Sequence, residues 1–482
     1  MKKRDFDAVV VGSGPNGLAA AITMQEAGLS VLLLECKDTI GGGLRSAELT
    51  LPGFVHDICS AIHPLAVESP FFKTLPLAAH GLRFVTPTVA AAHPFDNGTA
   101  AVLQKSIEKT ACSLNGDKNA YLNLIAPLVN DWPDIALSTL GPLRLPKHPL
   151  AMARFGWNAL TSAEFLARLR FQTVEARGLW AGMAAHAIQP LSKITTSAIG
   201  LVLMAMGHLN GWPVPVGGSQ SIATALAAYF TSIGGKIETG VYVKNLKQLP
   251  SAHAVLLDVT PKQLLSIAGH EFSSLYKWQL QRYRYGMGVF KIDWALDGPV
   301  PFKAAECRQA GTVHLGNTLE EIASAEKITS VGIHPERPFV LLAQQSLFDT
   351  TRAPEGKHTA WAYCHVPNGS ETDMTAAIEN QVERFAPGFK DLILARHTMH
   401  TAQMHEYNPN YIGGDINGGK LNIRQLYTRP ALRLSPYRTS AKGIYICSSS
   451  TPPGGGVHGM CGYHAARVAL KDVFELQARE LV

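Results

Sequence analysis

Three glycines near the beginning of the chain stand at the spacing G-x-G-x-x-G, with a proline and an asparagine inside it: Gly12, Gly14, Pro15, Asn16 and Gly17. Residues 8–11 form a short apolar run, which is typical of a strand buried on both faces of a parallel sheet. The first glycine permits a tight turn, the second lets the backbone approach a pyrophosphate, and the third lets the following helix pack closely. The stretch therefore predicts a turn that can hold phosphate groups.

The residues after this turn have the pattern of a helix and a second strand. Residues 16–27 are mostly good helix formers, and Gly28 follows where a helix cap is expected. The helix would direct its free N–H groups and positive dipole end at the phosphates. Residues 30–34 then form a second apolar run that ends at Glu35, 21 residues after Gly14. A carboxylate there accepts hydrogen bonds from ribose hydroxyls, so the unit predicts a dinucleotide site.

Two further glycine-rich loops bring the backbone close to a ligand. Gly42 and Gly43 precede Arg45, which either pairs with a phosphate or lies on the surface beside a turn. Near the end of the chain, residues 443–447 read as a strand, residues 452–456 as an exposed turn, and a helix is expected from Val457 onward. A helix N-terminus aimed into a site stabilises negative charge, which a reduced flavin gathers near its pyrimidine ring.

Composition limits the class of protein. The 482 residues are 46% hydrophobic and only 17% charged, which predicts a large packed core in two or three units and excludes a disordered chain. A formal charge of +6 is small for this length, so no nucleic-acid partner is expected. The seven cysteines form no C-x-x-C pair, which argues against a disulfide-reductase mechanism and favours a reducing compartment.

We expect a cytoplasmic protein. Residues 1–5 are too short and polar for a signal peptide, and the longest apolar stretch, residues 198–206, is too short to cross a bilayer. The basic and aromatic stretch 143–171 has two interpretations. It is either an amphipathic element that makes a peripheral membrane contact or the solvated basic face of a helical cap.

Changes in the expected pattern of strands and helices along the chain predict two interleaved domains. Strand–helix alternation is lost at about residue 81, returns near residue 210, and gives way to a mixed-sheet pattern from residue 276 to about 400. We therefore expect a dinucleotide-binding domain made of residues 1–80, 210–275 and 401–482. The intervening residues 81–209 and 276–400 would form the substrate or cap domain.

Five motifs along the chain carry a family resemblance: VVVGSGPNGLAAA, GGGLRS, WPVPVGGSQSIATALA, GGDINGG and YRTSAKGIYICSSSTPPGGGVHGMCGYHAAR. They resemble the phytoene desaturase and carotenoid isomerase group of FAD-dependent oxidoreductases, most closely the branch typified by pyridine nucleotide-disulphide oxidoreductase domain-containing protein 2. The resemblance implies an α/β fold, with a Rossmann-like FAD-binding domain of the glutathione-reductase and amine-oxidase type. It also implies a discontinuous α+β substrate or cap domain.

The resemblance implies roles for the residues of these motifs, with FAD as the cofactor. The pyrophosphate would lie at Gly12, Gly14, Pro15, Asn16 and Gly17, the adenosine ribose at Glu35, the middle of the cofactor at Gly42, Gly43 and Arg45, the adenine at the backbone of Val243, the isoalloxazine at Gly455, Gly456 and Val457, and its pyrimidine edge at Gly459 and Met460. Val243 is expected in a strand. Two departures from the family pattern are Ser448-Ser449 in place of Gly-Ala and a short segment between Val243 and Ala254.

Catalysis by such a site needs little from the protein beyond position and exclusion of water, because hydride passes to flavin N5. A base is needed only if a proton also leaves, and His458, beside the flavin loop, is the first candidate. The other candidates are His63, Tyr463, His464 and Glu406, each of which can equally be structural. No histidine cluster stands beside carboxylates at metal-ligand spacing, so no metal is expected.

The sequence thus predicts an oxidoreductase that desaturates or isomerises an apolar, isoprenoid-like or lipid-like small molecule. Only one nucleotide fingerprint is present, so oxygen or a quinone is the expected electron acceptor. Two alternatives stay open. One is a flavin amine oxidase, and the other is a non-catalytic FAD-containing binding or chaperone protein.

Overall fold

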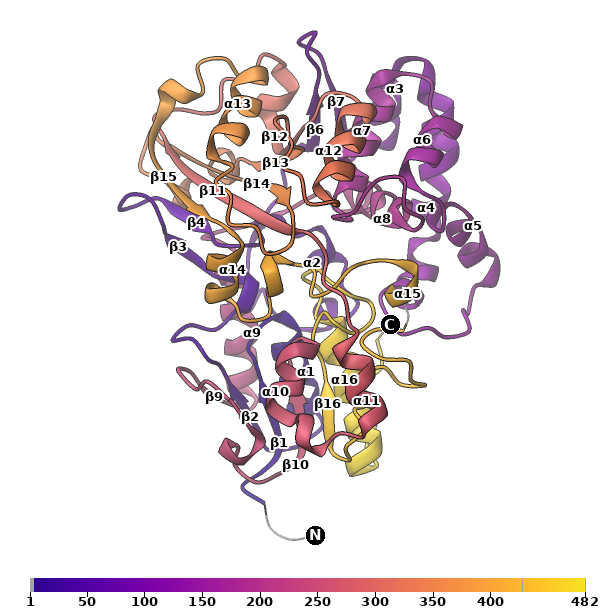
Figure 1. The fold of residues 1–482 in the computed structure, drawn as a ribbon, viewed down its shortest axis with the longest axis vertical. Helices are drawn as coiled ribbons and strands as arrows, with labels where there is room; N and C mark the ends of the chain where they lie inside the picture. Colours follow the sequence, from indigo (N-terminus) through magenta and orange to yellow (C-terminus); the bar gives the residue numbers. More distant parts are fainter. Residues whose placement is uncertain (1–3, 427, 482) are drawn as a thin grey trace.

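The computed structural model describes residues 4–426 and 428–481, which form two lobes (Figure 1). The lower lobe is built on a five-stranded parallel sheet of order β16-β10-β1-β2-β9. Its strands are β1 (Phe6–Val11), β2 (Val31–Leu34), β9 (Lys236–Glu238), β10 (Ala252–Leu257) and β16 (Ile444–Ile446). Segments far apart in the sequence therefore share one sheet.

Helices cover both faces of this sheet, which explains the unbroken apolar strands. Ala8 and Val10 pack in one cluster with α1 (Pro15–Glu26), α9 (Gln220–Ser232) and α16 (Met460–Ala469). Val9 and Val11 alternate with them and pack in another cluster with α10 (Pro261–Ala268) and α11 (Ser274–Gln281). Each residue from Ala8 to Val11 thus packs on an apolar cluster on one face or the other.

The upper lobe contains a seven-stranded mixed sheet of order β15-β11-β14-β13-β12-β6-β7. Its strands are β6 (Val89–Pro94), β7 (Ala100–Gln104), β11 (Gly288–Leu296), β12 (Ala310–Leu315), β13 (Val340–Ala343), β14 (His358–Val366) and β15 (Ile393–Met399). All neighbours are antiparallel except β12 and β6, which join the two separate parts of the chain. Side-chain rows run across the strands, because β12, β13, β14 and β11 are in register.

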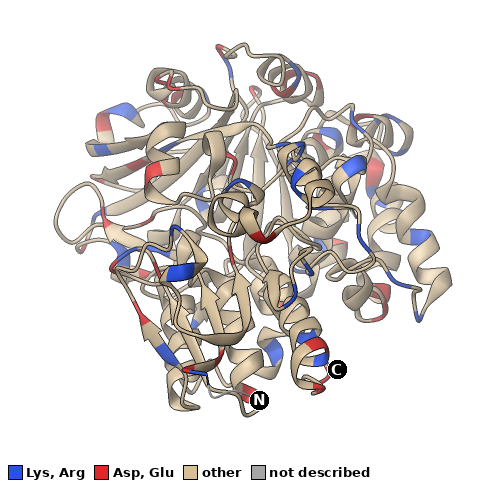
Figure 2. Ribbon diagram, turned by 60° about the horizontal axis from the view of Figure 1, so that its bottom comes forward, with Lys and Arg blue, Asp and Glu red and all other residues tan. Residues whose placement is uncertain are grey.

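The remaining elements surround this sheet or connect the lobes (Figure 1). The helices are α2 (Pro64–Glu68), α3 (Ile107–Ser113), α4 (Lys118–Thr139), α5 (Pro149–Ala159), α6 (Ala163–Arg170), α7 (Val174–Ala185), α8 (Thr196–Leu209), α12 (Leu319–Thr329), α13 (Thr375–Phe385), α14 (Thr401–Tyr407) and α15 (Ile423–Leu426). The short strands are β3 (Ser46–Glu48), β4 (Val55–Asp57), β5 (Phe84–Val85) and β8 (Val214–Pro215). Basic and acidic residues are interspersed over both lobes (Figure 2).

The predicted fold class is confirmed: a Rossmann-like α/β domain is combined with a second domain built on a mixed sheet. The domain boundaries stay a prediction.

Two local expectations were wrong. Val243 lies in coil after β9, because the chain there turns back to β2, where Val241 N–H donates to the Glu35 carbonyl. The last helix begins at Met460 and not at Val457, because Gly459 has a φ of +67°.

No helix in the described part of the chain is both long and apolar enough to cross a membrane.

Candidate active site

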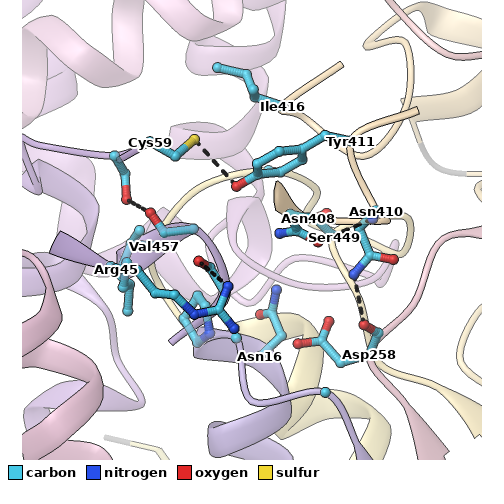
Figure 3. Close-up of a pocket in the computed structure, with 18 of the residues that line it drawn as sticks. Asn16, Arg45, Cys59, Asp258, Asn408, Asn410, Tyr411, Ile416, Ser449 and Val457 are labelled. Atoms are coloured by element: carbon cyan, nitrogen blue, oxygen red, sulfur yellow. Dashed lines mark hydrogen bonds between the residues drawn. The ribbon is translucent and has the colours of Figure 1, made fainter. Parts of the chain in front are cut away.

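A cavity of about 630 Å³ is lined by residues of both lobes. Most of the sequence-predicted site residues line it: Gly12, Gly14, Pro15, Asn16, Glu35, Gly42, Gly43, Arg45, Val243, Gly455, Gly456 and Val457. Gly17, His458, Gly459 and Met460 lie outside this lining. Figure 3 shows Arg45, Asn16 and Asp258 along one side of the cavity and Tyr411 and Ile416 along another.

The first glycine turn depends on contacts that a side chain would prevent. A Cβ at Gly17 would stand 1.9 Å from the carbonyl oxygen of Gly12, whose own φ is +101°. A Cβ at Gly42 would approach the Cα of Gly14 to 3.0 Å, so the two glycine loops pack on each other. The N-terminus of α1 opens beside the cavity, where the buried Asn16 Oδ1 has no hydrogen-bond partner among the described residues. The helix dipole and the backbone N–H groups of the turn, and not the Asn16 oxygen, make this a cradle for an anionic group.

Glu35 and Arg45 form a buried ion pair beside this cradle. Glu35 Oε1 lies 2.9 Å from Arg45 Nη2, and its Oε2 accepts hydrogen bonds from the Ser13 N–H and hydroxyl at 3.0 and 2.5 Å. Burial would raise the pKa of the Glu35 carboxyl. The Ser13 hydroxyl and the Arg45 guanidinium, with two backbone N–H groups, outweigh burial and hold that pKa below its ordinary value. Glu35 is therefore ionised, and it fixes Arg45 against the second loop.

Asp258 is a cavity residue that the sequence analysis missed. It follows β10, and its Oδ2 accepts a hydrogen bond from the Gly17 N–H at 2.9 Å. Burial, together with the charge of Glu35, raises the pKa of Asp258 to about 7, although the Gly17 N–H opposes the shift. Because neighbouring parallel strands end at the same edge, an acid directly after the 254–257 run was the available signal.

The second glycine turn lines the cavity with Gly455 and Gly456. A Cβ at Gly456, whose φ is +128°, would come within 2.9 Å of Leu65 Cδ1, and one at Gly455 would come within 3.0 Å of Asn417 Oδ1. Val457 follows on the cavity surface (Figure 3). The turn thus presents backbone, and not bulky side chains, to whatever occupies the cavity.

The structure does not bring the side chain of His458 to the cavity. Its Nδ1 accepts a hydrogen bond from the Met460 N–H at 3.0 Å, its carbonyl accepts one from the Ser69 hydroxyl, and burial lowers the pKa of its imidazole to about 4. These contacts suit a residue that holds the start of α16 in place. A catalytic role for His458 stays a prediction without a contact to support it.

Only one of the other candidate bases borders the cavity. Tyr463 donates to the Arg479 carbonyl and His464 lies against the Leu140 carbonyl, while Glu406 is absent from the lining. His63 lines the cavity, with its Nε2 at 2.7 Å from Ser219 Oγ and its Nδ1 without a partner in the described structure. Burial lowers the pKa of His63 to about 4, so its imidazole is neutral at pH 7.

The far end of the cavity rests on one face of the seven-stranded sheet. Neighbouring strands contribute four side chains to its floor: Thr312, Leu341, Trp361 and Tyr363. Leu203 of α8 and Trp212 also line the cavity. Sequence reasoning missed this floor, because it is created by cross-strand register and not by any local motif.

Comparisons with known proteins agree with this architecture. Residues 10–74 match the family described as NAD(P)-binding Rossmann-like domain. The chain is 27% identical to pyridine nucleotide-disulfide oxidoreductase domain-containing protein 2 of Rattus norvegicus, over 98% of this chain and 94% of that protein. It is 22% identical to a lycopene-forming phytoene desaturase of Pseudescherichia vulneris, over 96% of this chain and 98% of that protein. The resemblance drawn from the motifs is confirmed.

Solved structures show the same fold. Wild-type putrescine oxidase bound to putrescine superimposes with a TM-score of 0.63 at 16% identity, covering 98% of this chain and 99% of that chain. The protein therefore has the two-domain fold seen in amine oxidases, with a Rossmann-like nucleotide-binding lobe.

The raised pKa of Asp258 predicts a pH-dependent penalty on stability. The folded state binds the Asp258 proton up to about pH 7, whereas the unfolded carboxyl loses it near 3.8, so this group lowers the free energy of unfolding as pH rises between them. The slope would reach about 1.4 kcal/mol per pH unit. Asp258→Asn keeps the acceptor for Gly17 and should remove this slope.

Urea unfolding of both proteins at pH 4.5, 6 and 7.5 measures the effect. The buried histidines, whose pKa values are lowered, act in the opposite sense, so the two proteins are compared at each pH. The free energy of unfolding of Asp258→Asn should increase relative to that of the wild type as pH rises. A difference in this free energy that stays constant with pH would contradict the assignment.

Proposed function

We propose that the protein is an FAD-dependent oxidoreductase that dehydrogenates or isomerises an apolar, isoprenoid-like or lipid-like small molecule. The observation that carries the proposal is one cavity that runs from the glycine turn and Glu35, past the 455–457 turn, to an apolar sheet face. A nucleotide held at one end would thus have its reactive ring beside a water-poor pocket. Ligand pockets of this kind combine apolar walls with few polar groups.

The residues at the first end fit FAD. The glycine cradle and the start of α1 would hold the pyrophosphate, Glu35 the adenosine ribose, and the backbone of Val243 the adenine. Arg45, fixed by Glu35, would lie along the middle of the cofactor, and the backbone of residues 455–457 along its isoalloxazine. When bound, FAD supplies the hydride acceptor at N5.

The protein's own contribution is to orient the substrate and exclude water. The sheet floor and Leu203 with Trp212 would shield the reacting carbon from solvent, and neutral His63 lines the cavity directly before α2. If a proton must leave with the hydride, His63 borders the cavity and can accept it, whereas His458 would first have to move. The lowered pKa of His63 makes it a weak base, which suits desaturation of an activated position.

Charge distribution favours an apolar substrate over an amine. The two carboxylates among the described lining residues are Glu35 and Asp258, and both belong to the nucleotide end. An ammonium group at the sheet end would find no counter-ion there, and burying it unpaired is costly. Putrescine oxidase shares the fold, so the amine-oxidase alternative is tested with amines beside terpenes in anaerobic flavin reduction. A bound flavin that no donor reduces would favour a carrier protein.

The first prediction is that the purified protein carries non-covalent FAD and that Glu35→Ala weakens its retention. Loss of one charge-assisted hydrogen bond should cost about 1.5–3 kcal/mol, which lowers the affinity on the order of 10- to 100-fold. Reconstitution of the apoprotein, followed by flavin fluorescence, measures this. Glu238→Ala is the matched control, because Glu238 is an exposed carboxylate opposite Leu34 in β9. Equal affinities in both variants, or flavin retained after acid denaturation, would contradict the assignment.

A second prediction concerns electron transfer. The chain has one G-x-G-x-x-G fingerprint, which FAD would occupy, so oxygen or a quinone should reoxidise the flavin. Stopped-flow mixing under anaerobic conditions should show no rapid reduction by NADH or NADPH, whereas a quinone should reoxidise dithionite-reduced protein. Stoichiometric reduction by either nicotinamide would show that this expectation is wrong.

A third prediction places the protein at a lipid surface through the apolar residues of α5 and the loop before it. Leu145, Leu150 and Trp157 are 94%, 83% and 78% exposed. Arg154 pairs with Asp131 and Arg168 with Glu164, so the cations of this stretch are partly neutralised and insertion of apolar side chains must dominate.

Flotation with phosphatidylcholine–phosphatidylglycerol vesicles tests this contact. Leu150→Ser with Trp157→Ser should reduce flotation several-fold. Trp278→Ser is the control, because Trp278 is a 50% exposed tryptophan on α11 of the other lobe. If the wild type stays with the unbound fraction, or if the control loses flotation equally, α5 is only a solvated face.

A further inference from the structure

Two histidines meet at the sheet end of the cavity. His186, which follows α7, lines the cavity and is partly buried. Its Nε2 lies 2.9 Å from Nε2 of His314, a fully buried residue of β12. The rings are nearly perpendicular, with centroids 5.0 Å apart, and Trp212 packs edge-on against both. The proposed function gives this pair no role.

The pair is built into the fold by glycines of α7. A Cβ at Gly182 would stand 2.7 Å from His314 Nδ1, so only a glycine there leaves room for the imidazole. Gly178, one turn earlier, makes similar room for His93. As a result, His314 Nδ1 faces the helix and has no hydrogen-bond partner in the described structure.

This geometry determines which nitrogens carry protons. In an Nε2–Nε2 hydrogen bond, one ring must donate and the other accept. If His314 carried its proton on Nδ1, that buried N–H would be an unpaired donor, which proteins rarely tolerate. His314 therefore donates from Nε2, His186 accepts at Nε2, and the proton of neutral His186 is on Nδ1. The nitrogen left for a ligand is thus a donor.

The surroundings keep this donor uncharged. Burial lowers the pKa of His186 to about 3 and that of His314 well below its ordinary value. Two other uncharged groups of the cavity wall, Thr312 Oγ1 and Trp361 Nε1, are buried without hydrogen-bond partners in the part of the chain that the structure describes. Buried polar atoms of this kind are normally satisfied, which points to a ligand.

We propose that the substrate carries an uncharged oxygen, as a ketone, aldehyde or hydroxyl group, which accepts a hydrogen bond from His186 Nδ1 at the sheet end of the cavity. The inference rests on the proposed function and narrows its substrate class from a hydrocarbon to an oxygenated apolar molecule. His186 is a binding residue, and His314 is a positioning residue that fixes its tautomer.

A carboxylate or an ammonium group is a poorer occupant of this end. Neither Lys, Arg, Asp nor Glu lines it among the described residues, and a neutral imidazole cannot compensate a buried charge. Buried Glu326 of α12 pairs with His365 of β14 and is absent from the lining. On the same sheet face, Lys291 is in register with Tyr363 and Asp293 is in register with Trp361. These two form an ion pair with each other and are absent from the cavity lining.

The test compares four probes of equal chain length on the purified holoprotein: 1-tridecene, 2-tridecanone, 2-tridecanol and tridecanoate. Isothermal titration calorimetry gives each dissociation constant without turnover, and flavin absorbance of the same sample reports cofactor content. His186→Phe removes the donor at similar size. His186→Asn retains an amide N–H close to the position of the imidazole Nδ1.

The wild type should bind the ketone and the alcohol about 3- to 10-fold more tightly than the alkene, because one net hydrogen bond contributes a free energy of that size. It should bind tridecanoate no more tightly than the alkene. His186→Phe should abolish this preference while leaving the alkene affinity within about twofold, and His186→Asn should restore part of it. Nitrogen-15 histidine spectra should show Nδ1–H for His186, assigned by its loss in the variants.

The inference is overturned if the ketone-to-alkene ratio is unchanged in His186→Phe, if tridecanoate binds most tightly, or if none of the four probes binds. An Nε2–H tautomer of His186 would overturn it as well. These outcomes are separable from failure of the proposed function: a protein without flavin that still prefers the ketone through His186 contradicts the oxidoreductase and leaves the pocket assignment standing.

Discussion

The structure depends on the close approach of α1 to the ends of β1 and β10. The Gly17 backbone touches the carbonyl of Gly12 and donates to Asp258, and no residue with a side chain fits at Gly17. This contact places the start of α1 at the edge of the parallel sheet. It therefore also fixes the surface against which the 41–45 loop packs. The glycine spacing is thus a packing requirement first, and the phosphate cradle is its consequence.

Buried ion pairs then connect this edge to the upper lobe. Asp57, at the end of β4, accepts from the Ser219 N–H at 2.7 Å and pairs with Arg352 at 3.0 Å, while Arg352 also pairs with Asp349. Ser219 in turn lies 2.7 Å from His63. A charge left unpaired in such a network would be strongly destabilising, so the network favours one relative placement of the cavity walls. His63 is held by this network at the cavity surface.

Local motifs predicted the nucleotide end of the site and little of the other end. The stretch from Gly12 to Glu35 could be interpreted because strand, turn and helix are contiguous and each leaves a periodic signature. Asp258 needed the strand order, which places β10 beside β1. His186 and His314 are 128 residues apart, and their contact arises from α7 packing on β12. The family resemblance implied a strand at Val243, but the chain there is coil, and the Val241 N–H donates to the Glu35 carbonyl just after β2.

The two ends of the cavity differ in how they treat charge, and this difference follows from burial. Near the glycine turns, backbone N–H groups and Arg45 keep Glu35 ionised despite its burial, so that end suits an anionic, polar nucleotide. At the sheet end His186 and Tyr363 line the cavity without a charged partner among the described lining residues, and burial favours their uncharged forms: it lowers the pKa of the His186 imidazole and raises that of the Tyr363 hydroxyl. A low-dielectric region without countercharges strengthens each neutral hydrogen bond and penalises each ion. Under the proposed function, one cavity would therefore hold a charged cofactor where Glu35, Arg45 and Asp258 line it and an uncharged substrate where Thr312, Leu341, Trp361 and Tyr363 line it.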